Sequence, residues 1–238
     1  MSGIVIVTGA AGGIGRTVSL ALARAGHTVV AADLAGDDVE GAALSLRVDV
    51  TDVDSTREMA RAVAEQFGRI DGLVNNAAHY TSIVKAPFDE IDVTEWDRCF
   101  AVNVRGSWLC AAAVAPTMRT QRSGKIVNVS SMTVPTAPTG FAHYVSSKAA
   151  IVGLTRALAR ELGDSGVCVN TVTPDYIAFD REYDNRQPGM APMLTAQRCF
   201  KRDATADDLV GTLLYLLGPG SDFVTGQNIW INGGRAFA

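Results

Sequence analysis

The chain has 238 residues, of which 47% are hydrophobic and 19% are charged, and its 21 basic and 25 acidic side chains give a net charge of −4. This weakly acidic balance gives no basic surface for nucleic acids or anionic membranes, so we expect no partner of either kind. No apolar run reaches the length of a membrane span and the N-terminus has no secretory signal, which favours a cytoplasmic location.

Seven short runs of apolar and β-branched residues alternate along the chain with segments of helical length. Most runs are continuously apolar, as in strands that are covered on both faces. The segment 52–68 has helical character and ends at Gly68, a typical helix C-cap. This alternation predicts an α/β fold with a doubly wound, seven-stranded, mainly parallel sheet and helices on both faces. The runs begin at Ile4, Thr28, Ser45, Gly72, Lys125, Val167 and Asn228.

The junction between the first run and the following helix is the glycine-rich stretch TGAAGGIG, from Thr8 to Gly15. Gly9 permits a tight turn, Gly13 lets the backbone approach a pyrophosphate, and Gly15 lets the helix pack close to the strand. The free N–H groups and the dipole of the helix N-terminus favour a phosphate anion. The stretch predicts a dinucleotide site, and a turn that needs glycines only for its backbone angles is the alternative.

Two acidic residues follow at the ends of the next two runs. Asp33 lies 18 residues after Gly15, where a carboxylate can accept hydrogen bonds from the adenosine ribose hydroxyls and would repel a 2′-phosphate. No basic residue follows it closely, so the sequence favours NAD over NADP, with a solvated acid at a strand end as the alternative. Asp49 could accept a hydrogen bond from the adenine amino group, and a surface turn is the competing interpretation.

The predicted helix in AHYVSSKAAIVGL carries Tyr144 and, four residues later, Lys148, so both side chains leave one face of the helix. A free phenol has a pKa near 10, and a neighbouring ammonium lowers the pKa of tyrosine toward the range that acid–base catalysis requires. A surface contact with an extended lysine is the alternative. His143 leaves the helix about 100° away and is interpreted as structural. His27 and His79 have no ligand at metal-binding spacing, so no metal site is predicted.

Taken in order, several motifs resemble those of the short-chain dehydrogenase/reductase family, and the resemblance covers essentially all 238 residues. It implies a Rossmann-type fold, a nicotinamide cofactor, hydride exchange with an alcohol or carbonyl compound, and assembly as a homotetramer or homodimer. The motifs are TGAAGGIG, Asp33, DVT at Asp49, NNAA at Asn75, NV at Asn103, GKIVNVSS, YVSSK, VNTVTP and TGQNIWINGG.

Matching these motifs residue by residue places the family's catalytic side chains at Asn103, Ser131, Tyr144 and Lys148. The resemblance implies that Tyr144 exchanges a proton with the substrate oxygen and that Ser131 hydrogen-bonds this oxygen. Lys148 would bind the nicotinamide ribose, and Asn103 would hold a water that links Lys148 to solvent. Cofactor contacts are expected from Gly9, Gly13, Ile14, Gly15, Asp33, Asp49, Val50, Asn76, Ala77, Tyr144, Lys148, Pro174 and Ile177.

The chain departs from the family pattern after the sixth run. Pro174 is followed by Asp175 where the family commonly has glycine, and Phe179 stands where a threonine is often found near the nicotinamide amide. Both changes fall in the stretch from 174 to about 204, which breaks the strand–helix rhythm. We predict that this stretch is an irregular substrate lid on a single domain spanning residues 1–238.

The predicted pocket is mainly apolar, which suits a small-molecule substrate such as a hydrophobic or aromatic secondary alcohol or ketone. A polar substrate stays open because the lid also carries charged residues. Two other functions stay open: a 3-oxoacyl thioester reductase of the same family, and a regulator that binds NAD without catalysis. The expected walls are Ala78, His79, Tyr80, Met132, Thr133, Val134, Tyr176, Phe179, Tyr183, Met190, Met193, Leu194 and Phe200.

The four cysteines form neither a CxxC pair nor a dense framework of disulfides. We expect free thiols in a reducing compartment, packed as small core residues. They are Cys99, Cys110, Cys168 and Cys199.

Overall fold

The computed structural model describes residues 2–177 and 189–237. Within these residues the strands form one seven-stranded sheet in the order β3-β2-β1-β4-β5-β6-β7, and every neighbouring pair is parallel. The predicted doubly wound sheet is therefore confirmed. The strands are β1 (Ile4–Thr8), β2 (Thr28–Asp33), β3 (Leu44–Arg47), β4 (Gly72–Asn75), β5 (Gly124–Val129), β6 (Val167–Pro174) and β7 (Asn228–Ile231).

The third strand differs most from its predicted bounds. The apolar run extends from Ser45 to Val50, whereas β3 ends at Arg47. This strand lies at the edge of the sheet and pairs only with β2, whose last residue, Asp33, lies opposite Arg47. Just beyond that pair the backbone N–H of Val48 donates to the carbonyl oxygen of Asp33 at 2.8 Å, and β2 itself ends there, so the apolar character of the run did not predict where β3 ends.

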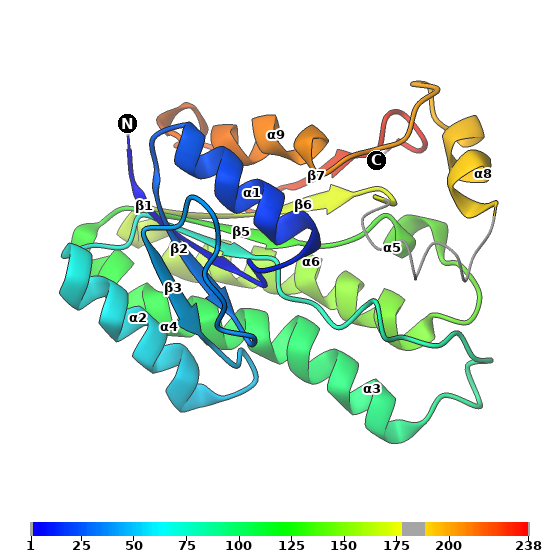
Figure 1. Ribbon diagram of the computed structural model, residues 1–238, viewed down its shortest axis with the longest axis horizontal. Helices are drawn as coiled ribbons and strands as arrows, with labels where there is room; N and C mark the ends of the chain where they lie inside the picture. The colour runs from blue at the N-terminus through cyan, green and yellow to red at the C-terminus, as the bar shows by residue number, and fades with distance from the viewer. Residues whose placement is uncertain (1, 178–188, 238) are drawn as a thin grey trace.

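Helices cover both faces of the sheet (Figure 1). On one face, α1 (Gly13–Arg24) and α9 (Asp207–Leu217) bury Val18 and Leu213 in a core with the strands. On the other face, Met59, Val114 and Leu162 of three helices belong to a second core. Burial on both faces explains why the strands read as continuous apolar runs. The helices of the second face are α2 (Val53–Phe67), α4 (Ser107–Gln121) and α6 (Ala142–Leu162).

Local sequence signals account for the bounds of α2. The carboxylate of Asp52 caps its N-terminus by accepting a hydrogen bond from the backbone N–H of Ser55 at 2.7 Å. At the other end Gly68 adopts a left-handed conformation with φ of 74°, as a C-cap glycine does. The predicted C-cap at Gly68 is therefore confirmed.

The helical segment that carries Asn103 is interrupted in its middle. It consists of α3 (Val93–Phe100), a π-helical stretch (Ala101–Gly106) and α4. The widened turn contains Asn103, whose side chain is buried. Such π-helical insertions often occur where a functional residue must be placed.

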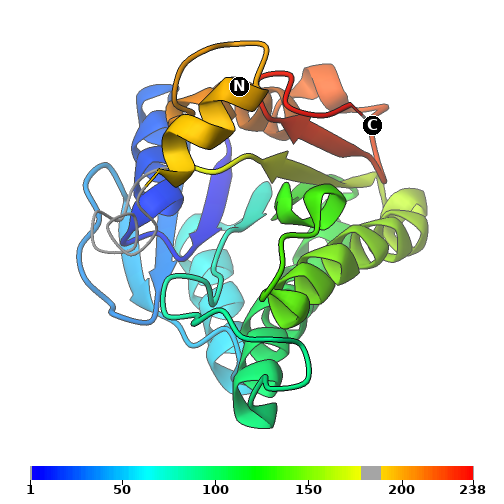
Figure 2. The same cartoon turned by 90° about the vertical axis from the view of Figure 1, so that its right-hand side faces the viewer.

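The carboxyl ends of the strands meet at one edge of the sheet, onto which Figure 2 looks. Because β1 lies between β2 and β4, the strand order reverses at this point, and ligands of doubly wound sheets bind at such a reversal. The short helix α5 (Thr133–Thr136), the segment after β4 and α8 (Met190–Gln197) surround this edge.

The predicted lid, 174 to about 204, is only partly described. Its second half contains the helix α8, so the expectation of an irregular segment is wrong there. Pro192 does not prevent this helix because it lies in the first turn, where a backbone N–H has no intrahelical partner. The predicted lid residues Phe179 and Tyr183 lie outside the described residues.

None of the described helices is both long and apolar enough to cross a membrane.

Candidate active site

A cavity of about 700 Å³ opens at the carboxyl edge of the sheet. Its walls include the glycine-rich loop, the end of β2, the first turns of α6 and residues of α8. Of the predicted site residues, Gly9, Gly13, Ile14, Asp33, Asn76, Ala77, Ser131, Tyr144, Lys148, Pro174 and Ile177 line this cavity, whereas Gly15, Asp49, Val50 and Asn103 do not.

The glycine-rich loop is packed so closely that side chains would not fit at two of its positions. Gly9 has φ of +65°, and a Cβ there would lie 2.9 Å from Cα of Ala77. A Cβ on Gly15 would lie 2.0 Å from the carbonyl oxygen of Gly9, so Gly15 acts through packing although it does not line the cavity. Gly12, by contrast, lines the cavity, and a Cβ there would meet no atom within 4 Å, so the backbone at this position is open to a ligand.

The side chains of Thr8, at the end of β1, and of Asn76, directly after β4, hold this loop in place. The Asn76 side-chain amide donates to the carbonyl oxygens of Thr8 at 3.0 Å and Gly9 at 3.1 Å. The Thr8 hydroxyl accepts from the backbone N–H groups of Asn76 and Ala77, both at 3.1 Å. The role of Thr8 was not anticipated, because its partners lie almost 70 residues away in the sequence.

Asp33 lies at the cavity wall beside the loop. Its two carboxylate oxygens accept hydrogen bonds from the backbone N–H groups of Ala11 and Ala35, each at 3.0 Å. In the sheet, Arg47 of β3 is the register partner of Asp33. The two residues are not adjacent in the sequence, so this basic neighbour was not predicted. The ion pairs of the described residues do not include one between Asp33 and Arg47.

Asp49 is engaged in a local turn rather than in the cavity wall. Its carboxylate oxygen accepts from the backbone N–H and the hydroxyl of Thr51, at 2.8 and 2.7 Å. Its expected contact with adenine, like that of Val50 with the cofactor, stays a prediction.

The loop, its exposed backbone and the carboxylate of Asp33 together fit a dinucleotide lying across the sheet edge.

Tyr144, Lys148 and Ser131 converge at the other part of the cavity. Tyr144 is 6% exposed and Lys148 is 3% exposed. The ammonium Nζ of Lys148 lies 5.9 Å from the centre of the Tyr144 ring and donates to the carbonyl oxygen of Val129 at 2.8 Å. The Ser131 hydroxyl oxygen accepts from the backbone N–H and the hydroxyl of Thr133, at 3.2 and 3.0 Å. Its own proton therefore remains available for another acceptor.

Burial has a clear electrostatic effect on Lys148. It lowers the pKa of this ammonium from the ordinary 10.5 to about 8, because the charged form loses its hydration. At pH 7 the ammonium form therefore still predominates. A cation therefore lies within electrostatic reach of the phenol, as predicted from the one-turn spacing.

Asn103 lies behind the cavity wall. Its side-chain oxygen accepts from the backbone N–H of His79 at 2.7 Å, and its amide donates to the Ser147 hydroxyl at 3.0 Å. Its carbonyl oxygen, in the π-helical turn, accepts from the Ser107 hydroxyl at 2.9 Å. These bonds connect the long helix, the segment after β4 and α6. The expected role of Asn103 in holding a water stays a prediction.

His79 was expected in the pocket wall, but it does not line the cavity. Its Nε2 lies 2.7 Å from a carboxylate oxygen of Glu95, and the Ser82 hydroxyl approaches Nδ1 at 3.3 Å. The separation of 16 residues from Glu95 gave no signal in the sequence. His143 is buried as expected for a structural residue, burial lowers its pKa, and neither ring nitrogen has a hydrogen-bond partner among the described residues.

Of the other residues that were predicted to line the pocket, some lie in the cavity wall and others do not. Phe200 is 67% exposed and, like Val134, lies outside the cavity wall. The four cysteines are free thiols, but Cys199 is exposed, so the expectation that all four pack in the core is wrong for this one. No group of three or more potential metal ligands occurs in residues 2–177 and 189–237. The predicted walls that do line the cavity are Ala78, Tyr80, Met132, Thr133, Tyr176, Met190, Met193 and Leu194.

Comparisons with known proteins match nearly the full chain. The family model described as Enoyl-(Acyl carrier protein) reductase matches residues 9–236. The 3-oxoacyl-[acyl-carrier-protein] reductase FabG of Staphylococcus aureus is 34% identical over 241 residues, covering 96% of each chain.

Two solved structures have the same architecture. A short-chain type dehydrogenase/reductase from Mycobacterium ulcerans superposes with a TM-score of 0.89 at 27% identity, covering 99% of this chain and 91% of that one. A protein from Beutenbergia cavernae, described as a "putative NAD(P) dependent gluconate 5-dehydrogenase" with NADP bound at low occupancy, gives a TM-score of 0.87 at 33% identity, covering 98% and 96%.

Proposed function

Because the chain belongs to the short-chain dehydrogenase/reductase family of oxidoreductases, we propose that it exchanges hydride between a nicotinamide dinucleotide, preferably NAD, and a secondary alcohol or ketone. The observation that carries this proposal is the shared cavity. One space of about 700 Å³ is lined both by the glycine-rich loop with Asp33 and by Ser131, Tyr144 and Lys148. A dinucleotide that lies along the loop can therefore reach the group that would exchange the proton.

The preference for NAD rests on Asp33. A carboxylate at the cavity wall can accept hydrogen bonds from the ribose hydroxyls and repels a 2′-phosphate. Arg47, next to Asp33 in the sheet, would suit a 2′-phosphate if the carboxylate were absent. With the carboxylate present, NAD is the better fit.

The side chains of the cavity account for the proton transfer. The bound nicotinamide supplies the hydride acceptor during oxidation and the hydride donor during reduction. Ser131 donates its hydroxyl proton in a hydrogen bond to the substrate oxygen and so orients it toward Tyr144. The Tyr144 phenolate takes the proton of the alcohol during oxidation, and the neutral phenol returns it during reduction. The ammonium of Lys148 stabilises the phenolate and can donate to a ribose hydroxyl.

The wall around Tyr144 supports an organic substrate of moderate size. The Tyr80 ring lies 5.1 Å from the Tyr144 ring, and Met132, Met190 and Leu194 complete an apolar surface. Hydrophobic or aromatic alcohols and ketones suit such a surface.

A second candidate is reduction of a 3-oxoacyl thioester. It is favoured by the names of the family model and of the 34% identical relative. The two candidates share the proton-transfer residues and differ in what occupies the remainder of the cavity.

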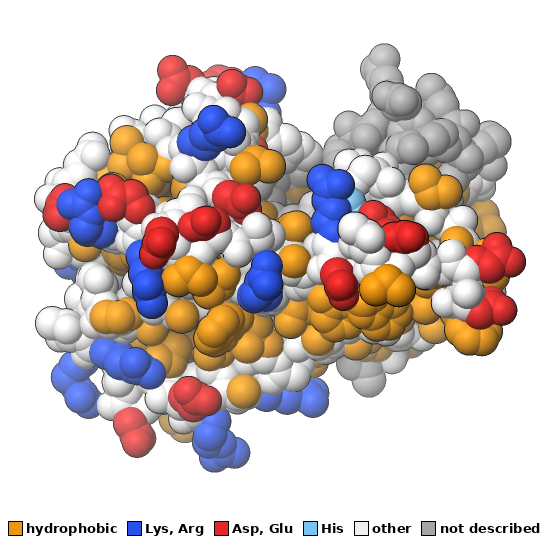
Figure 3. Space-filling model, turned by 90° about the horizontal axis from the view of Figure 1, so that it is seen from below, with side chains coloured by type: hydrophobic (Ala, Val, Ile, Leu, Met, Phe, Trp, Pro, Cys, Tyr) orange, Lys and Arg blue, Asp and Glu red, His pale blue; other side chains and the backbone are white. Residues whose placement is uncertain are grey.

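We further propose that the protein is located in the cytoplasm, because its free thiols are compatible with a reducing compartment. We also propose that it self-associates. Figure 3 shows hydrophobic side chains gathered on the face that carries α3 and α4. Trp96 and Trp108 are 37% and 48% exposed, and Trp96 stacks on Phe100 with ring centres 5.3 Å apart. Exposed apolar surface of this kind marks protein–protein contacts. Light scattering of the wild type and of Trp108→Glu tests this, and a monomeric wild type would contradict it.

Activity is tested with purified protein, NAD or NADP, and a panel of secondary alcohols, ketones and 3-oxoacyl thioesters of N-acetylcysteamine. Alcohol-dependent formation of NADH, followed by its absorbance, supports the main proposal. Reduction of the thioesters alone favours the second candidate. Binding of NADH without turnover of any compound would instead indicate a regulator.

A further inference from the structure

Asp175, which departs from the family's usual glycine, lies in a buried cluster of charges. One carboxylate oxygen accepts from Nε of Arg198 at 2.7 Å, and the other accepts from Nη1 of Arg235. The side chains of Asp175, Arg198 and Arg235 are 0%, 3% and 12% exposed. One carboxylate balances only one of the two guanidinium groups. The cluster therefore holds an excess positive charge where little water can solvate it.

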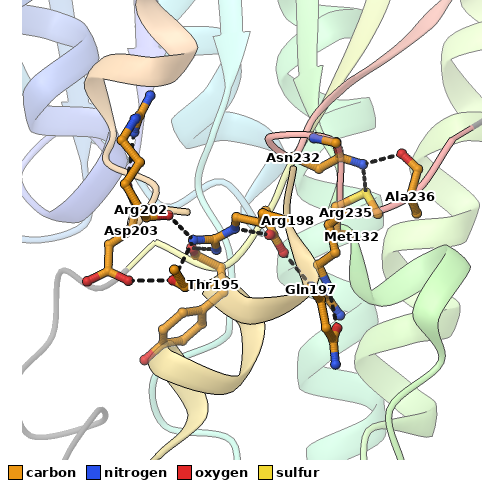
Figure 4. Close-up of polar contacts among 12 residues, drawn as sticks. Met132, Thr195, Gln197, Arg198, Arg202, Asp203, Asn232, Arg235 and Ala236 are labelled. Carbon is orange, nitrogen blue, oxygen red and sulfur yellow. Dashed lines mark hydrogen bonds and ion pairs between the residues drawn. The ribbon is translucent and has the colours of Figure 1, made fainter. Parts of the chain in front are cut away.

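The two arginines differ in how fully their donors are used. The donors of Arg198 reach Asp175, the hydroxyl of Thr195 and the carbonyl oxygens of Tyr176 and Arg202. Figure 4 shows this arginine enclosed by its partners. Arg235 donates through Nε to Gln197 and through Nη1 to Asp175. Its Nη2 amino group has no hydrogen-bond partner among the described residues.

Arg235 also lies at the substrate part of the site. It lines the same cavity as Ser131 and Tyr144, as does Asp175. The segment that carries it is fixed beside the serine, because the Asn232 amide donates to the carbonyl oxygen of Ala236 at 2.7 Å and lies 3.6 Å from Sδ of Met132 (Figure 4).

Among the described residues, the charges around Arg235 are predominantly positive, with two guanidinium groups against one carboxylate. Asp175 is the acidic residue of this part among the described lining residues, and it is already paired with two arginines. Asp33 belongs to the opposite part of the cavity, beside the glycine-rich loop. An apolar cavity whose wall carries a guanidinium group that is only partly balanced by a carboxylate favours an organic anion.

We propose that the substrate carries a carboxylate that Arg235 binds, so that the enzyme acts on a hydroxy acid or the corresponding keto acid. This inference rests on the proposed oxidoreductase function and specifies its substrate class. The planar guanidinium offers Nη2 to the carboxylate, and in a site with little water such a charge-assisted hydrogen bond is strong. Asp175 and Arg198 act as positioning residues, because they hold the Arg235 side chain at the wall. A 3-oxoacyl thioester has no carboxylate at the corresponding place and is disfavoured.

The test compares acids with their uncharged methyl esters. Binding of 3-hydroxybutyrate, mandelate and 4-(1-hydroxyethyl)benzoate, and of the three esters, is measured by calorimetry on protein loaded with NADH, which allows no oxidation. We expect at least one acid to bind the wild type about 30-fold or more tightly than its ester. Arg235→Gln should abolish this preference while leaving ester binding within about threefold, and Arg235→Lys should retain part of it. The matched control is Arg202→Gln, because the Arg202 side chain is exposed and pairs with Asp208. This variant should keep the preference for acids.

The outcomes separate this inference from the proposed function. A wild type that binds every acid no better than its ester overturns the inference, even if it oxidises uncharged alcohols. A preference for acids that persists in Arg235→Gln also overturns it. Loss of the preference in this variant supports the inference, even if no compound of the panel is oxidised. Circular dichroism and thermal unfolding of each variant confirm that it folds. If Arg235→Gln does not fold, Arg235→Lys provides the comparison with the wild type.

Discussion

Replacing Lys148 by methionine should stabilise the fold while removing the group that tunes the phenol. Lys148 is 3% exposed, and burial lowers its pKa from 10.5 to about 8. A tenfold change in an acid dissociation constant equals about 1.4 kcal/mol, so holding this ammonium in the folded protein costs about 3 kcal/mol at pH 7. The variant also loses the hydrogen bond from Nζ to Val129, worth about 1 kcal/mol. We therefore expect the free energy of unfolding of Lys148→Met to be about 2 kcal/mol higher than that of the wild type.

The pH dependence of this difference has a definite sign. Below pH 8 the lysine is protonated in both the folded and the unfolded protein, and the full cost applies. Between pH 8 and 10.5 the unfolded chain keeps a proton that the folded protein releases, so the stability of the wild type rises relative to that of the variant. The advantage of Lys148→Met should thus shrink by about 2 kcal/mol between pH 7 and pH 10.

Urea unfolding followed by circular dichroism at pH 7, 8, 9 and 10 measures this difference directly. Lys201→Met, which replaces an exposed lysine, is the matched control and should show no comparable trend. An advantage of Lys148→Met that is constant over this pH range, or a less stable variant at pH 7, would refute the electrostatic reasoning.

Two other substitutions test the cofactor and the support of the site. Asp33→Ala should raise the ratio of kcat/KM for NADP to that for NAD by about tenfold or more, because it removes a charge that repels a 2′-phosphate and leaves Arg47 next to the site. Steady-state kinetics with both cofactors measures the ratio, and a wild type that already prefers NADP would contradict the role of Asp33. Asn103→Ala should lower the free energy of unfolding by about 2 kcal/mol, because the buried N–H of His79 and hydroxyl of Ser147 lose a partner. Urea unfolding measures this loss, and an unchanged stability would show that Asn103 does not join the three segments.

The sequence predicted those features that depend on local pattern. Apolar runs such as those of β1 and β2 give buried parallel strands, and Gly68 marks the C-terminal end of α2. The turn spacing of Tyr144 and Lys148 placed both on one helix face, and the structure brings both to the cavity.

Features that depend on pairing across the fold were missed. The contacts of Asp175 with Arg198 and Arg235 join residues 23 and 60 positions apart, and nothing in the local sequence marks either pair. Arg47 lies beside Asp33 only because β3 pairs with β2. The unusual Asp175 was visible as a departure from the family pattern, but its consequence for charge in the cavity required the fold.

The measurement that tests the central claim most directly is the turnover of Tyr144→Phe compared with its affinity for the cofactor. The substitution removes one hydroxyl and keeps the ring that packs against Tyr80. We predict that alcohol-dependent NADH formation falls by about 10²–10⁴-fold, while the dissociation constant for NADH, measured by fluorescence, changes by less than about threefold. Turnover of this variant at the wild-type rate would contradict the assignment of Tyr144 as the group that exchanges the proton.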